Sequence, residues 1–265
     1  MTLFKKLSLI VLCFSLAAAI NSCSDSSTDP GDPPPQEEFN SQAAPGDSAH
    51  AYLAGDQYTS LQVEIDYMPG HEPTQEGLNS LQTFLEERLN KQNISLSTPN
   101  EINAESQSSY SSSDIRALEE EYRDNYTEAG DNTLHVYFLV VDGEFNDGNG
   151  GGSNVLGIAY WNTSVAFFGE TIANVSGTPP TAPSREKVES TVFRHEFGHN
   201  MGLVGIGTPH ISSHNDHQNG QSHCSTDGCL MDPAIETTNF FSNFSGEVPE
   251  LDQLCIEDLQ ANGGK

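Results

Sequence analysis

The chain has 265 residues and is strongly acidic, with 38 Asp and Glu against 10 Lys and Arg and a formal net charge of −28. This charge repels nucleic acid and anionic lipid surfaces, so it excludes nucleic acid as a partner. The length and a hydrophobic content of 35% allow one main globular domain with a substantial core.

The N-terminus has the organisation of a secretory signal. Lys5 and Lys6 precede an apolar run over residues 7–20 that is too short for a comfortable membrane span. A small residue stands before Cys23, and this stretch resembles the lipobox of bacterial lipoproteins, which implies cleavage before Cys23 and attachment of lipid to its sulfur. Residues 1–22 are therefore expected to be a signal peptide; the alternative is a plain secretory signal followed by an unrelated cysteine.

Residues 23–50 are expected to form a lipid-anchored, disordered tether. Ser, Asp, Pro and Gly dominate this stretch and apolar residues are scarce, so it cannot bury enough surface to fold. The globular domain then occupies residues 51–265. The expected location is the bacterial cell envelope, on the periplasmic side or on the outer-membrane and extracellular face.

Apolar patterning predicts the elements of a mixed α/β domain. Strands are expected at 58–68, 94–96, 133–141, 155–160 and 164–168. Helices are expected at 74–89, 113–125 and 248–261, with another that begins at Ser184. Thr74 is the expected N-cap of the first helix, and Ser113 or Asp114 that of the second. The run over 133–141 is nearly all apolar, which is typical of a central strand buried on both faces.

The candidate metal ligands and catalytic base lie in one stretch, His195-Glu196-Phe197-Gly198-His199. Residues four apart on a helix lie nearly one above the other, so His195 and His199 can direct both imidazoles to one point, as two ligands of a metal ion do. Glu196 lies beside the first ligand but off its direction, where it can serve as a general base. The alternative is an ordinary amphipathic helix with two histidines.

A catalytic zinc ion has three protein ligands and one open position, so a third ligand must come from downstream. The candidates are His210, His214, Asp216, His217 and His223.

The motif HExxHxxG, from His195 to Gly202, resembles that of the metzincin metallopeptidases. This resemblance implies a metzincin-like zincin of the α/β (α+β) class: a twisted mixed sheet, an active-site helix and a small C-terminal part after a Met-turn. By its order in the chain, the segment with the strands 155–160 and 164–168 also resembles the metzincin edge strand that binds the substrate backbone; the alternative is an ordinary hairpin. Gly202 is expected to end the helix and to keep the ligand face free of a side chain that would crowd the ion.

The family places its third histidine at position 205, which is glycine here. However, a second cluster resembles the continuation found in archaemetzincins, and it consists of His223, Cys224, Cys229 and Met231. Under this resemblance residues 203–222 are an inserted loop, and His223 is the third ligand, with His214 as the runner-up. Met231 forms the turn beneath the metal.

Three cysteines remain after the predicted cleavage and lipidation: Cys224, Cys229 and Cys255. Archaemetzincins hold a second, structural zinc with the matching pair and a downstream CxxC, but Cys255 has no such partner, so half of that site is missing. In an oxidising compartment the simpler expectation is a disulfide, either between Cys224 and Cys229 or between one of them and Cys255. One zinc ion per chain is therefore expected.

The sequence thus predicts a zinc-dependent metalloendopeptidase, held at a membrane by its N-terminal lipid, that hydrolyses peptide or protein substrates by Glu-assisted attack of a zinc-bound water. The alternative is a non-catalytic, zinc-stabilised surface binding or adhesion lipoprotein. Glu196 favours the enzyme, because purely structural zinc binding does not need that carboxylate. A third hypothesis is a gluzincin-type peptidase with Glu236 as a carboxylate ligand, although the helical acidic motif of that family is absent.

Overall fold

The computed structural model describes residues 38–105, 107–148, 154–177, 182–216, 222–242, 244 and 246–265. The predicted signal peptide, the lipidation site Cys23, the first part of the predicted tether and His217 lie outside the described residues. The chain divides into two units, 1–35 and 36–265, and only the second is described below. Within the described residues, no helix is both long and apolar enough to cross a membrane.

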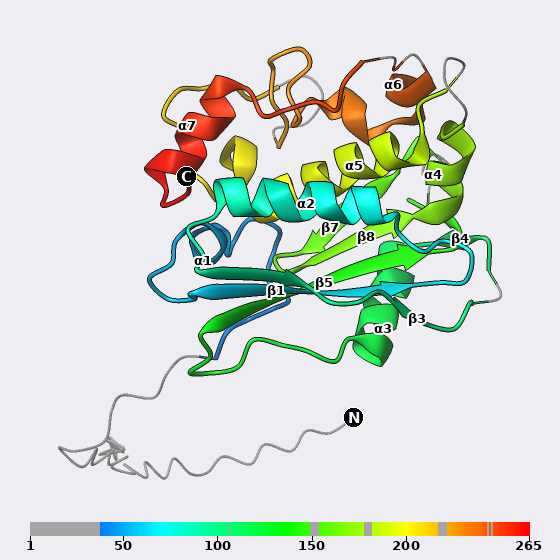
Figure 1. Cartoon of the computed structure of the whole chain (residues 1–265), viewed down its shortest axis with the longest axis horizontal. Coiled ribbons are helices and arrows are strands. Elements are labelled where there is room, and N and C mark those ends of the chain that lie inside the picture. Colours follow the sequence, from blue (N-terminus) through cyan, green and yellow to red (C-terminus); the bar gives the residue numbers. More distant parts are fainter. Residues whose placement is uncertain are drawn as a thin grey trace, which may run out of the picture. The chain divides into compact units, whose positions relative to one another are not determined.

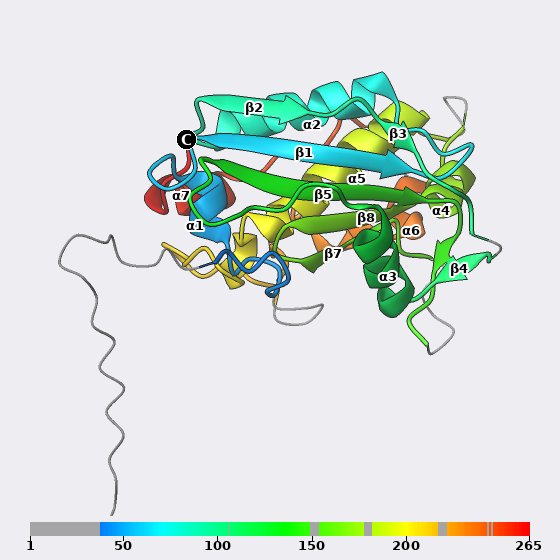
Figure 2. The ribbon, with the colours of Figure 1, turned by 90° about the horizontal axis from the view of Figure 1, so that it is seen from below.

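A mixed, mostly parallel sheet lies at the centre of this unit, with strand order β2-β1-β5-β8-β7 and β3 also paired with β1 (Figure 2). The strands are β1 (Ser60–Tyr67), β2 (Asn93–Leu96), β3 (Asn100–Glu101), β5 (Thr133–Val141), β7 (Gly157–Trp161) and β8 (Ser164–Phe168). Strand β7 alone in this sheet runs antiparallel to its neighbour, β8. A small second sheet pairs β4 (Ser109–Tyr110) with β6 (Glu144–Phe145). The predicted α/β class is confirmed.

Helices cover both faces of the sheet. Helices α2 (Gln75–Arg88) and α5 (Arg185–Asn200) lie on one face, and α3 (Ser112–Tyr122) lies on the other (Figure 1). Alternate residues of β5 therefore enter two separate cores: Phe138 packs in the core under α2 and α5, and Tyr137 in the core beside α3. This arrangement explains why the β5 sequence is almost continuously apolar. The remaining helices are α1 (Ala49–Leu53), α4 (Gly169–Val175), η2 (Leu203–Gly205), η3 (Pro233–Glu236), α6 (Thr238–Ser242) and α7 (Gln253–Ala261).

The predicted N-cap is correct for the first predicted helix and wrong for the second. Thr74 caps α2 as predicted, because its side chain accepts a hydrogen bond from Gly77 N. Helix α3 begins earlier than predicted, and its cap is Ser111 rather than Ser113 or Asp114. The reason is a capping box, in which Ser111 N donates to the carboxylate of Asp114 at 2.8 Å while Asp114 N donates to Ser111 Oγ.

The last part of the predicted tether is folded onto the domain. Asn162, in the turn between β7 and β8, donates from Nδ2 to Asn40 O (2.8 Å) and to Ser48 Oγ (2.6 Å). Its Oδ1 accepts from Ala43 N at 3.0 Å. The ordered structure thus begins before residue 51, because the turn supplies the polar partners that a free segment would take from water. We call residues 40–48 the N-terminal strap.

Candidate metal centre

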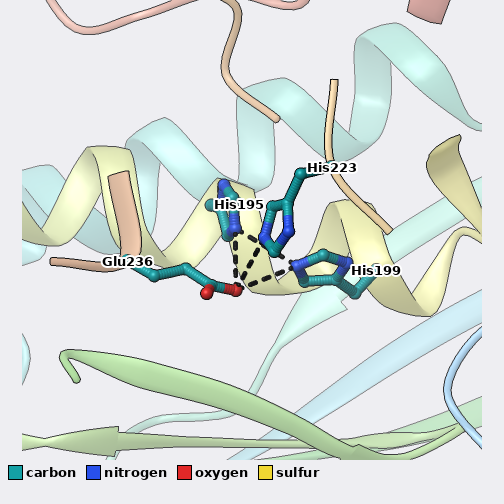
Figure 3. Close-up of side chains that lie close together, drawn as sticks. All are labelled: His195, His199, His223 and Glu236. Carbon is teal, nitrogen blue, oxygen red and sulfur yellow. Dashed lines mark hydrogen bonds and ion pairs between the residues drawn. The ribbon is translucent and has the colours of Figure 1, made fainter. Parts of the chain in front are cut away.

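Three imidazoles converge at the C-terminal half of α5 (Figure 3). One helical turn brings His195 and His199 together, with 3.2 Å between their Nε2 atoms. The ring of His223 lies 5.4 Å from that of His195 and 5.0 Å from that of His199. A β-bridge between Asn215 and Cys224 closes the base of the loop and carries His223 to this point. The pair and the third histidine predicted from the sequence are therefore brought together.

The hydrogen bonds of His195 determine which of its nitrogens is free. Its Nδ1 lies 2.6 Å from Leu230 O, and a carbonyl oxygen can only accept, so Nδ1 carries the proton. Nε2 is therefore the nitrogen that faces His199. Burial lowers the pKa of His199 to about 4, so this ring is neutral at pH 7. Neutral imidazoles held in place by backbone carbonyls are the usual protein ligands of zinc.

The carboxylate of Glu236 reaches the same point from η3. Its Oε1 lies 2.9 Å from Nε2 of His223 and 3.3 Å from Nε2 of both His195 and His199. Burial alone would raise the pKa of Glu236, but the contacts with the three imidazoles outweigh it and hold that pKa well below its usual range. Converging lone pairs repel one another unless a cation lies among them. This donor set fits zinc, which binds imidazole nitrogen and carboxylate oxygen.

Glu196 lies beside this centre with its carboxylate buried. Among the described residues, no hydrogen bond of regular geometry reaches either carboxylate oxygen. Burial, and then the charge of Glu236, raise the pKa of Glu196 well above its usual range. A carboxylate with a raised pKa accepts a proton readily, which a general base needs.

Gly157 of β7 is a further residue of the site, and the sequence reasoning missed it. A Cβ at this position would lie 2.9 Å from Glu196 Cγ and 3.0 Å from its Oε1. The absence of a side chain therefore leaves room for the carboxylate of Glu196. The only signal in the sequence is a glycine inside a predicted strand, which often marks the close approach of another group.

A cleft of about 350 Å³ opens over the centre. Its lining includes Glu196, His199 and Glu236, together with Ile158 and Ala159 of β7. In the described part of the sheet β7 pairs only with β8, so its other edge is unpaired. Pro45 of the N-terminal strap also lines this cleft. An unpaired strand edge beside a cleft is suited to bind an extended peptide by main-chain hydrogen bonds.

Gly202 has a different role from the one expected. It ends α5, as predicted, with a left-handed φ of 73°. However, a Cβ there would lie 2.6 Å from Thr208 N and 2.7 Å from Ala49 Cβ. Glycine is thus required by the turn and by the packing of neighbouring segments rather than by the space around an ion.

The predicted disulfide is contradicted, because Cys224, Cys229 and Cys255 are all free thiols. The sulfurs of Cys229 and Cys255 are 3.8 Å apart, whereas a disulfide bond measures about 2.05 Å. Two of the thiols approach His214 instead of pairing: His214 Nδ1 lies 3.3 Å from Cys224 Sγ and 4.0 Å from Cys255 Sγ. His214, the runner-up for the third ligand, therefore belongs to this second cluster.

The second cluster also has the donors of a metal site. Nε2 of His214 lies 2.8 Å from Asp258 Oδ2, which orients the ring and leaves Nδ1 free to face the sulfurs. Contacts with the thiols of Cys229 and Cys255 hold the pKa of Cys224 below its ordinary value. Three thiols and one imidazole form a donor set that closed, structural zinc sites use.

Comparisons with known proteins agree with the chemistry of the first centre. Residues 75–204 match the model of the reprolysin-like metallopeptidase family M12B. The match covers just under half of the chain and ends at residue 204, so it does not include His223. No curated protein matches the chain.

Two solved structures are similar to this chain. Archaemetzincin from Methanopyrus kandleri has 15% identity and a TM-score of 0.48, over 78% of this chain and 96% of that one. A zinc-dependent peptidase from Methanocorpusculum labreanum (strain Z) has 12% identity and a TM-score of 0.43, over 74% of this chain and 99% of that one.

The peptidase family match includes α5 and both of its histidines, so the protein is a metallopeptidase. The donor set of the first centre makes it a zinc peptidase, with peptides or proteins as its substrates.

Proposed function

We propose that the protein is a metalloendopeptidase in which His195, His199 and His223 hold the zinc ion and Glu196 is the general base. The observation that carries this proposal is the convergence of the three Nε2 atoms beside the buried carboxylate of Glu196. The donors come from two segments at least 24 positions apart, and His199 and Glu196 line the cleft of about 350 Å³. The alternative, a non-catalytic zinc-stabilised binding module, is not favoured, because structural zinc binding does not need a carboxylate at the position of Glu196.

Each residue has a defined part in the reaction. Zinc, when bound, supplies a Lewis acid that polarises the scissile carbonyl group and acidifies the attacking water. Glu196 takes a proton from that water at a carboxylate oxygen and passes it to the nitrogen of the leaving amine. Leu230 O holds the proton on His195 Nδ1, so that Nε2 stays available to the metal. Ile158 and Ala159 form an apolar wall of the cleft beside the reacting groups.

The unpaired edge of β7 supports cleavage within a chain. A peptide added to that edge lies extended along the strand and passes over the centre, so the scissile bond is an internal one. The main-chain groups of β7 fix the position of the substrate without reading its side chains.

The test compares cleavage of casein by the wild-type protein and by Glu196→Gln, with zinc measured in both. The amide cannot take up the proton, so we expect a loss of about 10²- to 10⁴-fold in kcat with unchanged zinc content. Glu186→Gln, in the first turn of the same helix, is the matched control and should cleave like the wild type. Full activity of Glu196→Gln would refute the assigned role. Zinc binding without cleavage in any of the three proteins would favour the binding module.

We also propose that Cys224, Cys229, Cys255 and His214 hold a second, structural zinc ion. The proposal is supported by the free thiols, by the approach of Cys224 and Cys255 to His214 Nδ1, by the 3.8 Å between the sulfurs of Cys229 and Cys255, and by the carboxylate of Asp258 behind the ring. It replaces the expectation of one zinc ion per chain. Such an ion would fix the start of α7 to the segment that carries His223.

We propose, on the sequence alone, that Cys23 is lipidated and anchors the chain in the bacterial cell envelope. Expression in a bacterium fed with radiolabelled palmitate tests this: the wild-type protein should carry label and enter the detergent phase, and Cys23→Ala should do neither. Label on the variant would contradict the assignment.

A further inference from the structure

The carboxylate of Glu236 has a place at the centre that the proposed mechanism does not use. Figure 3 shows this carboxylate opposite the three imidazoles. The distance from Oε1 to each Nε2 is 2.9 to 3.3 Å. These four atoms lie within 4.8 Å of one another. The sequence offered Glu236 as a substitute for a histidine ligand; the structure brings it to the centre in addition to His223.

The local sequence explains how Glu236 arrives there. Asp232 caps the short helix η3, with its Oδ1 accepting from Ala234 N at 2.9 Å, and Pro233 occupies the first position of the helix. This turn directs residue 236 back toward α5, immediately after the buried Met231. Glu236 therefore lies on the same support as the turn beneath the histidines, and its side chain remains 31% exposed toward the cleft.

The contact between Glu236 and His195 has the geometry of two ligands of one ion. Nδ1 of His195 donates to Leu230 O, so Nε2 is the nitrogen that faces the carboxylate, 3.3 Å from Oε1. A cation between these two atoms would be held by both of them. One carboxylate oxygen and three imidazole nitrogens form a complete four-ligand set for zinc.

A complete set has a consequence for catalysis. Zinc sites with four protein ligands are typically structural, whereas catalytic sites keep one position open for water or substrate. Glu236 borders the cleft into which the substrate must enter. We propose that Glu236 is a fourth, displaceable ligand that closes the zinc centre at rest and leaves it when substrate binds. This inference rests on the proposed three-histidine centre and adds a self-inhibiting carboxylate to it.

The test replaces Glu236 with Gln, which keeps the size of the side chain but removes its charge. Zinc affinity, measured by competition with a chromophoric chelator, should fall by about 10- to 100-fold, as it does when even an outer partner of a ligand is lost. In the Co²⁺-loaded proteins the visible spectrum should change. Azide, a small anion that occupies an open position, should bind to Glu236→Gln at a concentration at least about 10-fold lower than to the wild type.

Two further variants control this experiment. Glu247→Gln alters a carboxylate that is 98% exposed and should match the wild type in zinc affinity, spectrum and azide binding. Glu236→Asp keeps the charge but shortens the side chain by one methylene. Its affinity for azide should therefore lie between those of the wild type and Glu236→Gln. Because Glu236→Asp keeps a carboxylate, its zinc affinity and azide binding can still be measured if Glu236→Gln does not fold.

The outcomes separate this inference from the proposed function. If His199→Ala loses the ion while both Glu236 variants match the wild type in zinc affinity, spectrum and azide binding, the centre stands and the role of Glu236 is overturned. If His199→Ala binds Co²⁺ with an unchanged spectrum, the three-histidine centre itself fails. Raised azide affinity in Glu236→Gln, with ion binding lost in His199→Ala, supports both.

Discussion

Gly198 of α5 lies directly against the sulfur of Met231: a Cβ at position 198 would overlap Met231 Sδ and would lie 3.1 Å from its Cε. The glycine between the two histidines of the helix is thus the site where the turn beneath the centre packs. Both residues are buried, so neither can move away from an added methyl group without disturbing the core.

Gly198→Ala should therefore destabilise the protein by about 1 to 3 kcal/mol through overpacking. Met231→Ala should cost about 2 to 5 kcal/mol, because it leaves a cavity. The double variant should be more stable than the sum of the two predicts, since the alanine methyl group partly fills that cavity. Urea unfolding of the four proteins measures the coupling, and strictly additive effects would show that the two side chains do not meet.

Gly157→Ala should impair catalysis without removing the metal. The added Cβ would lie 2.9 Å from Glu196 Cγ, so the carboxylate must shift. A displacement of about 1 Å can cost about 10²-fold in rate, and we expect a loss of that size in kcat. Zinc content should stay the same. Gly246→Ala, whose Cβ would meet only Phe244 at 3.8 Å, is the control. A Gly157→Ala enzyme with wild-type kcat would mean that Glu196 tolerates the shift.

The zinc content of histidine variants should show which of the two clusters each histidine belongs to. The wild-type protein should contain two zinc ions per chain. His223→Ala should lose one ion together with cleavage, because it removes a ligand of the catalytic centre. His214→Ala should lose the other ion, and His210→Ala should retain both. A wild-type ratio of one would restore the single-zinc expectation and would leave the thiol cluster without a metal.

The buried ion pair between Arg123 and Glu119 should be important for stability. Their side chains are 0% and 1% exposed, and Arg123 Nη1 donates to Glu119 Oε1 at 2.6 Å. Arg123→Ala leaves an uncompensated buried carboxylate, so a loss of about 3 to 5 kcal/mol is expected in thermal or urea unfolding. Lys187→Ala breaks a pair at the surface and should cost at most about 1 kcal/mol. Similar losses in the two variants would contradict the difference in burial.

Stability should also depend on pH through Asp66 of β1. Burial raises the pKa of Asp66 above 3.8, although hydrogen bonds from Asn100 and Tyr137 act against this. A raised pKa means that the folded state binds the proton more tightly, so the stabilisation is full below about 3.8 and is lost as pH rises through the folded pKa. Asp66→Asn imitates the protonated acid. Relative to the wild type, it should be more stable at pH 7 than at pH 4, as urea unfolding at both values can show. If the difference in stability between Asp66→Asn and the wild type is the same at pH 4 and pH 7, the raised pKa of Asp66 is refuted.

The parts of the fold that depend on local pattern could be predicted from the sequence. The period of two in β1 and the apolar run of β5 arise from which faces of each strand are buried, and both strands were predicted within two residues of their bounds. The helical spacing of His195 and His199 is equally local. The cap of α3 was missed because Ser111, Ser113 and Asp114 are all good capping residues, and only the side-chain geometry distinguishes them.

The relations between distant segments could not be derived in the same way. Residue types alone left five candidates for a third ligand, and only a family resemblance singled out His223. The predicted disulfide between Cys224 and Cys229 is wrong, because the spacing of the cysteines does not reveal that the thiol of Cys224 lies against His214. The approach of Glu236 depends on the direction of a four-residue turn, which no periodicity encodes.

The hydrogen bonds of Asn162 to the N-terminal strap give the position of a proteolytic cut its consequence. Because Pro45 is part of the cleft wall, a cut upstream of Asn40 would leave the cleft intact. A cut at residue 50 would remove the strap, open one side of the cleft and leave the amide of Asn162 without its partners. If Cys23 carries the proposed lipid, release of the domain from it would thus preserve the site at the first position and damage it ten residues later.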